Sequence, residues 1–227
     1  MITVIIPALN EGKTIANVVK FCLKNERVSQ IIVVDDQSTD DTCQQAAEAG
    51  ASVVISARRG KGFSMKEGIV LARNEILVFL DADIDPYPES TIERLGAPLL
   101  AGTSDFVKAS FSRNAGRVTE MLAKPLLSIL YPELTIFNQP LGGIIAGRKT
   151  FFQQIDFQDD YGADVGILID MFQLGARIRE VNIGHIENKS KPWQELPRMC
   201  GEVATAILRK ALLAGKRPSR GRPLPEL

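Results

Sequence analysis

Two periodicities alternate along the first third of the chain. Apolar runs rich in β-branched residues have the length of buried strands, and they occupy residues 3–7, 30–34, 52–56 and 75–80. The segments between them repeat apolar residues every three or four positions, as amphipathic helices do, at residues 14–25, 38–49 and 64–73. Strands that alternate with helices form parallel sheets. The pattern therefore predicts an α/β fold, with a Rossmann-like, mostly parallel central sheet and helices on both faces.

The second half of the chain is more mixed. Strand patterns recur at residues 105–111, 142–147 and 176–183, and helical patterns at residues 117–130, 161–174 and 196–214. Pro125 should bend the first of these helices, because proline lacks the N–H that an interior helical hydrogen bond needs. We expect a single domain over residues 1–214, followed by a basic, Pro-rich and flexible tail over residues 215–227.

Composition narrows the class of protein without identifying it. The 227 residues include 27 Lys and Arg and 27 Asp and Glu, so the net charge is zero and no global field favours nucleic acid. The three cysteines are scattered, which argues against a disulfide framework and fits a reducing cytoplasm. No apolar run reaches the length of about 18 residues that a membrane span needs. Met1 leads directly into a strand, so a secretory leader is not expected either.

Two carboxylates follow the apolar run at residues 75–80. Side chains alternate faces along an extended chain, so Asp81 and Asp83 can face one ligand together. Carboxylate oxygens suit a hard cation, Mg²⁺ or Mn²⁺, that also binds phosphates. An Asp-x-Asp pair is a weak signal alone, and its setting strengthens it. Ligands of parallel α/β sheets bind beyond the carboxyl ends of the strands, where this sequence gathers residues 7–11, 35–36, 58–62 and 81–83.

Two of these strand-end segments have both a functional and an ordinary interpretation. The run Arg58-Arg-Gly-Lys-Gly62 could hold phosphates through its glycine backbone and basic side chains, or it could be a basic surface turn. The acidic run from Asp35 to Asp40 could accept hydrogen bonds from a base or ribose, or it could only cap the next helix.

Three further positions offer candidate chemistry. His185 is the one histidine; it follows a predicted strand and could join Asp83 at a metal, or it could be structural. The helix start at residues 116–119 combines free backbone N–H groups with the guanidinium of Arg117, which together suit an anion. Asp164, early in a predicted helix, could cap that helix or bind a hydroxyl group of a sugar or acceptor.

Taken together, these motifs carry a family resemblance. Ile6-Pro-Ala-Leu-Asn-Glu11, Val33-Val-Asp-Asp-Gln-Ser-Thr-Asp40, Arg59-Gly-Lys-Gly62 and Asp81-Ala-Asp83 resemble the nucleotide-sugar glycosyltransferases of GT-A fold and family 2 type. Further on, Phe106-Val-Lys-Ala-Ser-Phe-Ser-Arg113, Gly116-Arg-Val-Thr-Glu120, Gln139-Pro-Leu-Gly-Gly143 and Tyr161-Gly-Ala-Asp164 are similar to the glucosyl-3-phosphoglycerate synthase family. That family moves glucose from a nucleotide diphosphate to 3-phosphoglycerate and retains the anomeric configuration.

The resemblance implies an enzyme, a metal and two substrates. The chain would be a metal-dependent retaining hexosyltransferase of the cytoplasm, with Mg²⁺ or Mn²⁺ as cofactor. Its donor would be UDP-glucose, with GDP-mannose left open by the residues themselves, and its acceptor 3-phosphoglycerate. Residues 1–90 would form the nucleotide-sugar half and residues 91–214 the acceptor half. A homodimer is one assembly that such a chain can form.

The resemblance also implies a role for each motif residue. The catalytic residues would be Asp83 and Asp164. The nucleotide-sugar would contact Pro7, Ala8, Leu9, Glu11, Asp36, Ser38, Lys61, Asp81 and Ala82. The acceptor phosphate would lie against Gly116, Arg117, Val118 and Thr119. The metal would be held by Asp83 and His185. The family's metal-binding histidine aligns with Asn188, so either His185 replaces it from three residues earlier through a loop shift, or Asn188 stands there as a weaker ligand.

Two other functions remain open from the residues. A polyprenyl-phosphate sugar transferase would share the first half, and the amphipathic helix at residues 196–214 with the basic tail is its support. A non-catalytic nucleotide-sugar-binding module would explain the departure at Asn188, although the intact Asp81 and Asp83 count against it.

Overall fold

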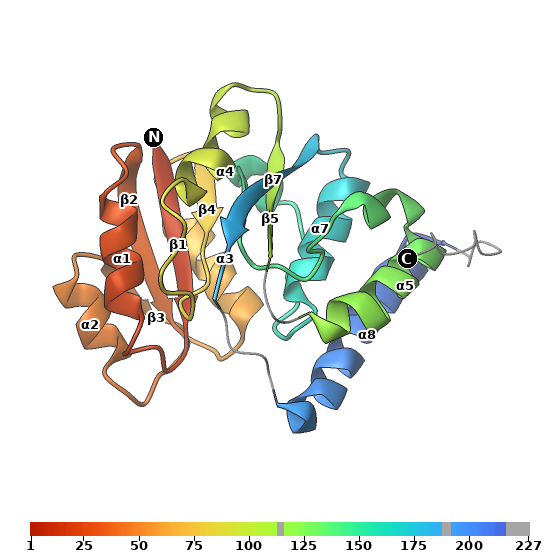
Figure 1. Ribbon diagram of the computed structural model, residues 1–227, viewed down its shortest axis with the longest axis horizontal. Coiled ribbons are helices and arrows are strands. Elements are labelled where there is room, and N and C mark those ends of the chain that lie inside the picture. Colours follow the sequence, from red (N-terminus) through yellow and green to blue (C-terminus); the bar gives the residue numbers. More distant parts are fainter. Residues whose placement is uncertain (113–115, 188–191, 217–227) are drawn as a thin grey trace.

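The computed structural model describes residues 1–112, 116–187 and 192–216 (Figure 1). Within them the strands are β1 (Ile2–Ala8), β2 (Val28–Asp35), β3 (Ser52–Ile55), β4 (Ile76–Phe79), β5 (Phe106–Ser112), β6 (Ile145–Arg148) and β7 (Ile178–His185). They form one sheet in the order β3-β2-β1-β4-β6-β5-β7. The four strands of the first half are mutually parallel, and β5 is parallel to β7. β6 alone runs antiparallel to both of its neighbours, so the predicted mostly parallel sheet is confirmed.

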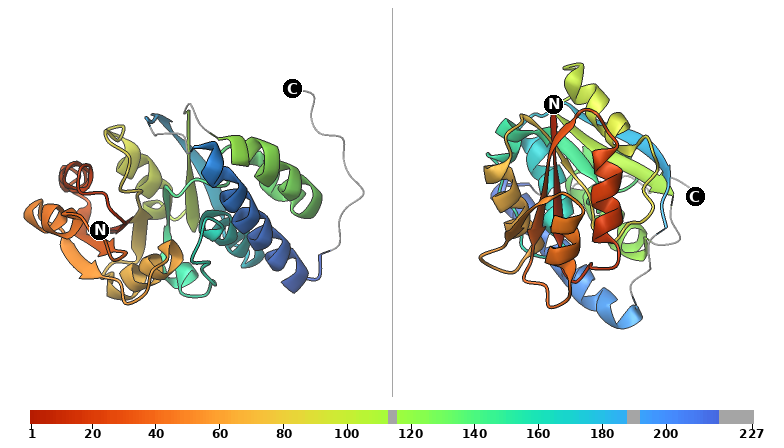
Figure 2. Two further views of the ribbon diagram at one scale, coloured as in Figure 1. Left: turned by 90° about the horizontal axis from the view of Figure 1, so that it is seen from below. Right: turned by 90° about the vertical axis from the view of Figure 1, so that its left-hand side faces the viewer.

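Helices cover both faces of this sheet, as predicted (Figure 2). The α-helices are α1 (Ile15–Leu23), α2 (Thr42–Glu48), α3 (Lys61–Leu71), α4 (Thr91–Leu100), α5 (Lys124–Leu130), α6 (Lys149–Phe152), α7 (Ala163–Gln173) and α8 (Leu196–Leu213). Short helical turns are η1 (Thr119–Ala123), η2 (Pro132–Ile136) and η3 (Trp193–Glu195). None of the helices in the described ranges is both long and apolar enough to cross a membrane.

The core is divided by the sheet into two apolar clusters. Successive strand residues point to opposite faces, so Ile5 packs with α3, α5, α7 and α8, while Val4 packs with α1, α2 and α4. The alternation explains why the strands of the first half read as continuous apolar runs: both of their faces are covered by helices.

Several elements differ from the sequence prediction. The helix α4 was not predicted, because Gly96 and Pro98 interrupt its pattern, yet it buries Ile92, Leu95 and Leu99 on one side. The short helices η2 and α6 were not predicted either. The strand predicted at residues 142–147 begins only at Ile145, and the helix predicted from Ser64 begins at Lys61. Both shifts matter for the site, because they place Gly143 in a loop and Lys61 on the first turn of a helix.

The bend predicted at Pro125 takes the form of a wide turn. Residues 119–123 make a π-helical turn, η1, that runs directly into α5, with Pro125 in the first turn of α5. A proline ring clashes with the carbonyl four residues before it and has no N–H to donate. A π-turn widens the backbone at that point, and so relieves the clash.

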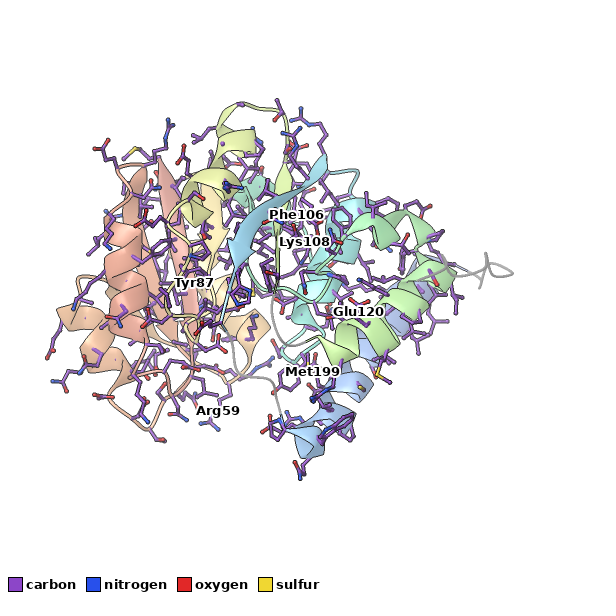
Figure 3. All side chains as sticks on the ribbon, viewed as in Figure 1. Arg59, Tyr87, Phe106, Lys108, Glu120 and Met199 are labelled. Atoms are coloured by element: carbon purple, nitrogen blue, oxygen red, sulfur yellow. The ribbon has the colours of Figure 1, made fainter. Side chains whose placement is uncertain are left out.

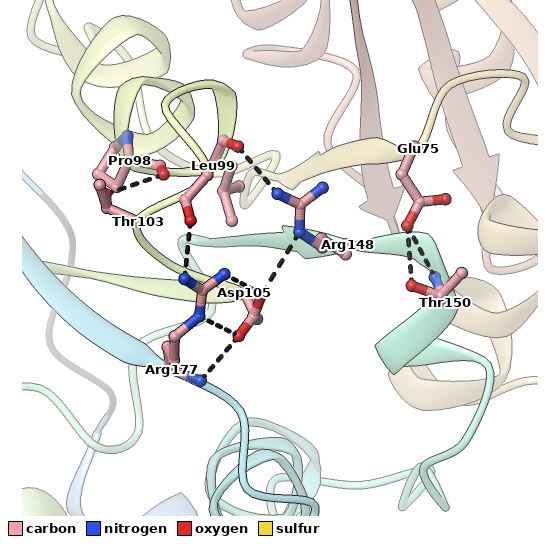
Figure 4. A network of polar contacts seen from close by, with 9 residues as sticks. Glu75, Pro98, Leu99, Thr103, Asp105, Arg148, Thr150 and Arg177 are labelled. Carbon is pink, nitrogen blue, oxygen red and sulfur yellow. Dashed lines mark hydrogen bonds and ion pairs between the residues drawn. The ribbon is translucent and has the colours of Figure 1, made fainter.

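A charged network joins the amino ends of β5 and β7 and lies away from the strand ends at which the sequence predicts ligand binding (Figure 4). Asp105 accepts hydrogen bonds from the backbone N–H, Nε and Nη2 of Arg177 at 3.1, 2.8 and 2.8 Å. Arg148 lies 3.4 Å from the same carboxylate and donates to the carbonyl of Leu99, at the end of α4. The network therefore ties β5, β6, β7 and α4 together.

Candidate functional site

A cavity of about 590 Å³ opens beyond the carboxyl ends of β1, β2 and β4. Its lining contains nine of the residues that the sequence predicted there: Pro7, Ala8, Leu9, Glu11, Asp36, Lys61, Asp81, Ala82 and Asp83. The topology brings these positions together because parallel neighbours end at the same edge of the sheet. The cavity is thus the place at which the strand-end motifs meet.

Ser38 lies beside the cavity and outside its lining. Its hydroxyl accepts the backbone N–H of Asn10 at 2.9 Å, and its own N–H donates to Asp35 at 3.0 Å. Asn10 has a positive φ of 57° and accepts the N–H of Thr39 in return. Ser38 therefore joins the turn after β1 to the turn after β2, and its predicted contact with the nucleotide stays a prediction.

Asp36 anchors the basic loop to β2. Its carboxylate accepts the backbone N–H of Gly60 at 2.9 and 3.1 Å and the hydroxyl of Ser64 at 3.1 Å. Both donors lie where α3 begins, and an acidic group is favourable near the N-terminus of a helix. Asp36 thus holds the start of α3 in place and does not cap α2, the helix that follows it in sequence, as the ordinary interpretation had predicted.

Glycine is required on both sides of Lys61. Gly60 has a φ of +138°, and a Cβ added there would lie 2.7 Å from the Cβ of Asp159. A Cβ on Gly62 would lie 1.9 Å from the backbone oxygen of Gln158. The first turn of α3 is therefore wedged against residues 157–159, which aims Lys61 into the site.

Lys61 bridges two carboxylates that are far apart in the sequence. Its ammonium group donates to Asp81 and to Asp164, at 3.1 Å each. Burial by itself would lower the pKa of Lys61, but the charges of Asp164 and Asp81 outweigh it and raise the pKa above its ordinary value. Lys61 is therefore a fixed positive charge at the cavity wall, as a phosphate-binding role requires.

The two carboxylate oxygens of Asp164 differ in their hydrogen bonding. Its Oδ2 accepts Lys61, whereas its buried Oδ1 has no hydrogen-bond partner among the described residues. A buried acceptor without a donor is costly, and an incoming hydroxyl group would satisfy it. Asp164 itself does not line the main cavity, so its predicted role at a sugar or acceptor hydroxyl stays a prediction.

The loop that precedes β6 closes over Lys61. A Cβ on Gly143 would lie 2.5 Å from both the ammonium of Lys61 and the carboxylate of Asp81, so any side chain there would displace this ion pair. The neighbouring carbonyl of Gly142 accepts the ammonium of Lys108 at 2.8 Å. Lys108 is completely buried on β5, near the centre of the molecule (Figure 3), and burial lowers its pKa to about 8. Lys108 therefore holds the loop in place from beneath.

Asp83 lies where the main cavity meets a second one. β4 ends at Phe79, so Asp81 and Asp83 lie in a turn and not on the strand itself, yet both line the main cavity. Asp83 also lines a neighbouring cavity of about 730 Å³ together with His185. The Nδ1 of His185 lies 3.0 Å from the hydroxyl of Ser112, a contact that orients the imidazole.

These two residues fit a divalent cation that is shared with a phosphate ligand. The described residues contain no group of three or more His, Cys, Asp and Glu side chains that could enclose a metal. Mg²⁺ is typically held by one or two carboxylates and completed by substrate phosphates. Asp83 supplies one carboxylate at the cavity edge, and His185, which lines the second cavity with it, offers an imidazole nitrogen. Asn188, the alternative position, lies outside the described residues.

The predicted acceptor residues form a helix start, as expected. Gly116 has a φ of +133°, and the N–H of Glu120 returns to its carbonyl at 3.0 Å. Arg117 is exposed, whereas Val118 and Thr119 are buried. These residues do not line the main cavity. The guanidinium of Arg117 stacks instead on the ring of Trp193, with its carbon 4.6 Å from the ring centre. Trp193 lies in η3, the turn that leads into α8.

The main cavity is also lined by Arg59, Gly60 and Tyr161, which belong to motifs named from the sequence. Its lining further includes four residues that sequence reasoning missed: Asp159, Asp160, Arg198 and Glu202. Arg198 and Glu202 form an ion pair at 2.7 Å, and Glu202 accepts the backbone N–H of Tyr161. A pair four residues apart on a helix resembles any surface pair, so the sequence carried no signal for it.

Comparison with known proteins identifies relatives that match most of the chain. Residues 3–158 match the model of glycosyl transferase family 2. The glucosyl-3-phosphoglycerate synthase of Mycolicibacterium paratuberculosis is 36% identical over 91% of this chain and 71% of its own length. That of Petrotoga mobilis is 30% identical over 95% of this chain and 74% of its own length.

Solved structures agree with the sequence relatives. The crystal structure of glucosyl-3-phosphoglycerate synthase from Mycobacterium tuberculosis in complex with phosphoglyceric acid has a TM-score of 0.89 and 34% identity, over 93% of this chain and 80% of that one. A complex of the same enzyme with Mn²⁺, UDP-glucose and phosphoglyceric acid has a TM-score of 0.88 and 32% identity, over 99% of this chain and 88% of that one.

Proposed function

The chain belongs to glycosyl transferase family 2 and, within it, to the glucosyl-3-phosphoglycerate synthases, and from this premise we propose that it transfers glucose from UDP-glucose to 3-phosphoglycerate, with Mg²⁺ or Mn²⁺ and with retention of the anomeric configuration. The observation that carries the proposal is the main cavity, at which the motifs of β1, β2, α3 and β4 meet. Asp83 lines both this cavity and the second one, which His185 also lines. Its volume of about 590 Å³ is within the range of small-molecule sites.

The donor is assigned to the main cavity. Pro7, Ala8, Leu9 and Glu11 would receive the nucleoside, with Asp36 and Ser38 near the base and ribose. Asp83 and His185 would hold the cation, which when bound would offset the negative charge that develops on the departing diphosphate. Lys61 would add a fixed positive charge beside it, with Asp81 and Ala82 completing the wall.

The acceptor is assigned to the start of the η1–α5 helix. The first N–H groups of a helix have no carbonyl partner within it, and Arg117 adds a guanidinium that can grip a phosphate with two bonds. Gly116, Val118 and Thr119 would supply backbone donors, because Val118 and Thr119 have buried side chains.

The reaction then needs positioning and charge stabilisation more than a covalent intermediate. The acceptor hydroxyl would approach the sugar on the same face as the departing diphosphate, which takes its proton. Asp164 would orient a hydroxyl through its unpartnered Oδ1, and Lys61 would hold Asp164 in place. Retention is tested by proton NMR of the product, in which the glucosyl linkage should keep the α-configuration of the donor.

Residues 1–214 would act as one transferase domain of two halves. Support comes from the sheet, in which β4 of the donor half pairs with β6 of the acceptor half. A cytoplasmic location is supported by the free state of Cys22, Cys43 and Cys200.

The test is turnover with radiolabelled UDP-glucose and three acceptors. We expect 3-phosphoglycerate to be used, glycerate to be poor and a polyprenyl phosphate to be inert. Arg117→Ala should raise the KM for 3-phosphoglycerate strongly and leave UDP-glucose binding nearly intact, and Arg117→Lys should recover only part, because lysine lacks the planar fork. Preference for glycerate or for the polyprenyl phosphate, or no transfer at all, would contradict the proposal; GDP-mannose serves as the donor control.

A further inference from the structure

The exposed indole of Trp193 lies against the one guanidinium of the proposed acceptor site. The side chain of Trp193 is 65% exposed, and it belongs to neither apolar cluster of the described residues. Tryptophan is highly buried on average, so core packing does not account for this residue. Its ring lies beneath the guanidinium carbon of Arg117, 4.6 Å away, from an element 76 positions further along the chain.

Arg117 is itself poorly placed for helix stability. A positive side chain in the first helical turn is repelled by the partial positive charge of the helix N-terminus. Its guanidinium therefore does not stabilise the free helix, but it does suit an anion that binds at that end. Without a support, the long side chain of Arg117 would also have many rotamers, and ordering it on binding would cost affinity.

Stacking supplies such a support without using the hydrogen-bond donors. An indole holds the flat face of a guanidinium, and the N–H groups in the plane stay free for two parallel bonds to a phosphate. We propose that Trp193 is a positioning residue that holds the Arg117 guanidinium ready for the acceptor phosphate; the proposal rests on the function proposed above for this site.

The connection of Trp193 to the donor cavity fits this role. The turn η3 leads directly into α8, and the first turns of α8 carry Arg198 and Glu202, which line that cavity. One continuous helical segment thus contacts the acceptor helix at Trp193 and the donor cavity a few residues later. The segment can hold the two sites in a fixed relation.

Kinetics test the role of Trp193. Trp193→Ala should raise the KM for 3-phosphoglycerate about two- to five-fold, the effect of losing a surface cation–π contact, with kcat and the KM for UDP-glucose nearly unchanged. Trp193→Phe should recover part of the loss, because a ring face remains. In an Arg117→Ala background, Trp193→Ala should add nothing. Leu212→Ala, at the exposed far end of α8, is the matched control and should change no constant.

Fluorescence tests the contact independently of turnover. Trp193 is the only tryptophan in the chain, so its emission reports on this position alone. Arg117→Ala should alter the emission of the ligand-free protein, and 3-phosphoglycerate should alter that of the wild type but not that of Arg117→Ala. Emission that is indifferent to Arg117, or a Trp193→Ala enzyme with an unchanged acceptor KM, overturns the inference. A wild type that does not turn over 3-phosphoglycerate overturns the proposed function instead, and the emission of the ligand-free Arg117→Ala variant still decides whether the contact exists.

Discussion

The carboxylates at the site differ in the groups that they contact. Asp81 and Asp164 share Lys61, whereas Asp83 lines both the main cavity and the second cavity, which His185 also lines. Asp81 thus binds a cation of the protein itself, and the role that we propose for Asp83 is to hold a metal.

Asp83→Asn should lower turnover by about 10²-fold or more, on the scale of losing an electrostatic stabiliser of the transition state. The amide keeps the shape of the side chain and removes its charge. Initial rates at saturating UDP-glucose and Mn²⁺ measure the effect, and EDTA should abolish the activity of the wild type. Asp156→Asn, which removes an exposed carboxylate near Lys66, is the control. Full activity in EDTA would rule out the metal.

Lys61→Met should weaken UDP binding by about 1–3 kcal/mol, the range of a charge-assisted contact at a partly buried site. The loss has two sources, because the variant removes a positive charge and leaves Asp81 and Asp164 facing each other without it. Calorimetry with UDP and Mn²⁺ measures the affinity. Lys66→Met, on the same helix but paired with the exposed Asp156, should bind normally. Equal affinities of the two variants would make the Gly-Lys-Gly segment an ordinary turn.

At the scale of elements, the packing of α3 decides where the donor loop lies. Gly60 and Gly62 let the first turn of this helix approach residues 157–159 more closely than any side chain would allow. On the opposite edge of the sheet, the Asp105 network joins β5 to β7 and fixes the strand that carries Lys108. The site thus depends on contacts made at both ends of the strands.

The contribution of the Asp105 network to the free energy of unfolding should depend on pH. Hydrogen bonds from Arg177, together with the nearby Arg148, lower the pKa of Asp105 to about 2 from its ordinary 3.8. A carboxyl whose pKa is lower in the folded state stabilises fully above about pH 4 and loses that contribution as pH falls towards 2. Because Arg177 is exposed to water, we expect a contribution on the order of 1 kcal/mol.

Urea unfolding of the wild type and of Asp105→Asn at pH 7, 4 and 2.5 measures this contribution. The wild type should be more stable than Asp105→Asn at pH 7. The difference in their free energies of unfolding should become smaller between pH 4 and pH 2.5. A difference that stays constant across this range would show that the charge of Asp105 contributes nothing.

At the scale of the whole molecule, α8 packs within the acceptor half and reaches the donor cavity through Arg198 and Glu202. It packs against α5 and α7, the layer seen beside the sheet in Figure 2. Its one buried charge, Lys210, donates to Asp170 of α7 and to the backbone of Asp156. Burial raises the pKa of Asp170 in spite of that ammonium. The pair therefore fixes how α8 lies on the core.

Lys210→Met should destabilise the fold by about 3–5 kcal/mol, because it leaves a buried carboxylate without its partner. The double variant Lys210→Met, Asp170→Leu should recover most of that loss, since apolar replacements of a buried ion pair are often neutral. Thermal and urea unfolding measure both. Lys124→Met is the control: it breaks an exposed ion pair with Glu120 and should lower the free energy of unfolding by less than about 1 kcal/mol. A double variant as unstable as the single one would contradict this account.

The sequence by itself determined what depends on neighbours along the chain. Alternating and helical periodicities report which faces are buried, so they predicted the strands, most helices and the edge of the sheet at which ligands bind. The same local logic placed Asp81, Asp83 and the residues after β1 at one cavity, because parallel strands end together. It failed at α4, where Gly96 and Pro98 hide a helix that tertiary packing stabilises.

Only the tertiary structure decided the contacts between segments distant in sequence. Lys61 meets Asp164 across 103 positions, Gly143 closes over Lys61, and α8 brings Arg198 to the donor cavity and Trp193 to Arg117. The antiparallel insertion of β6 between β4 and β5 makes these meetings possible. No periodicity encodes such contacts, since they follow from how complete layers pack; the sequence could name Lys61, Asp164 and Arg117 as candidates but could not say which residues they meet.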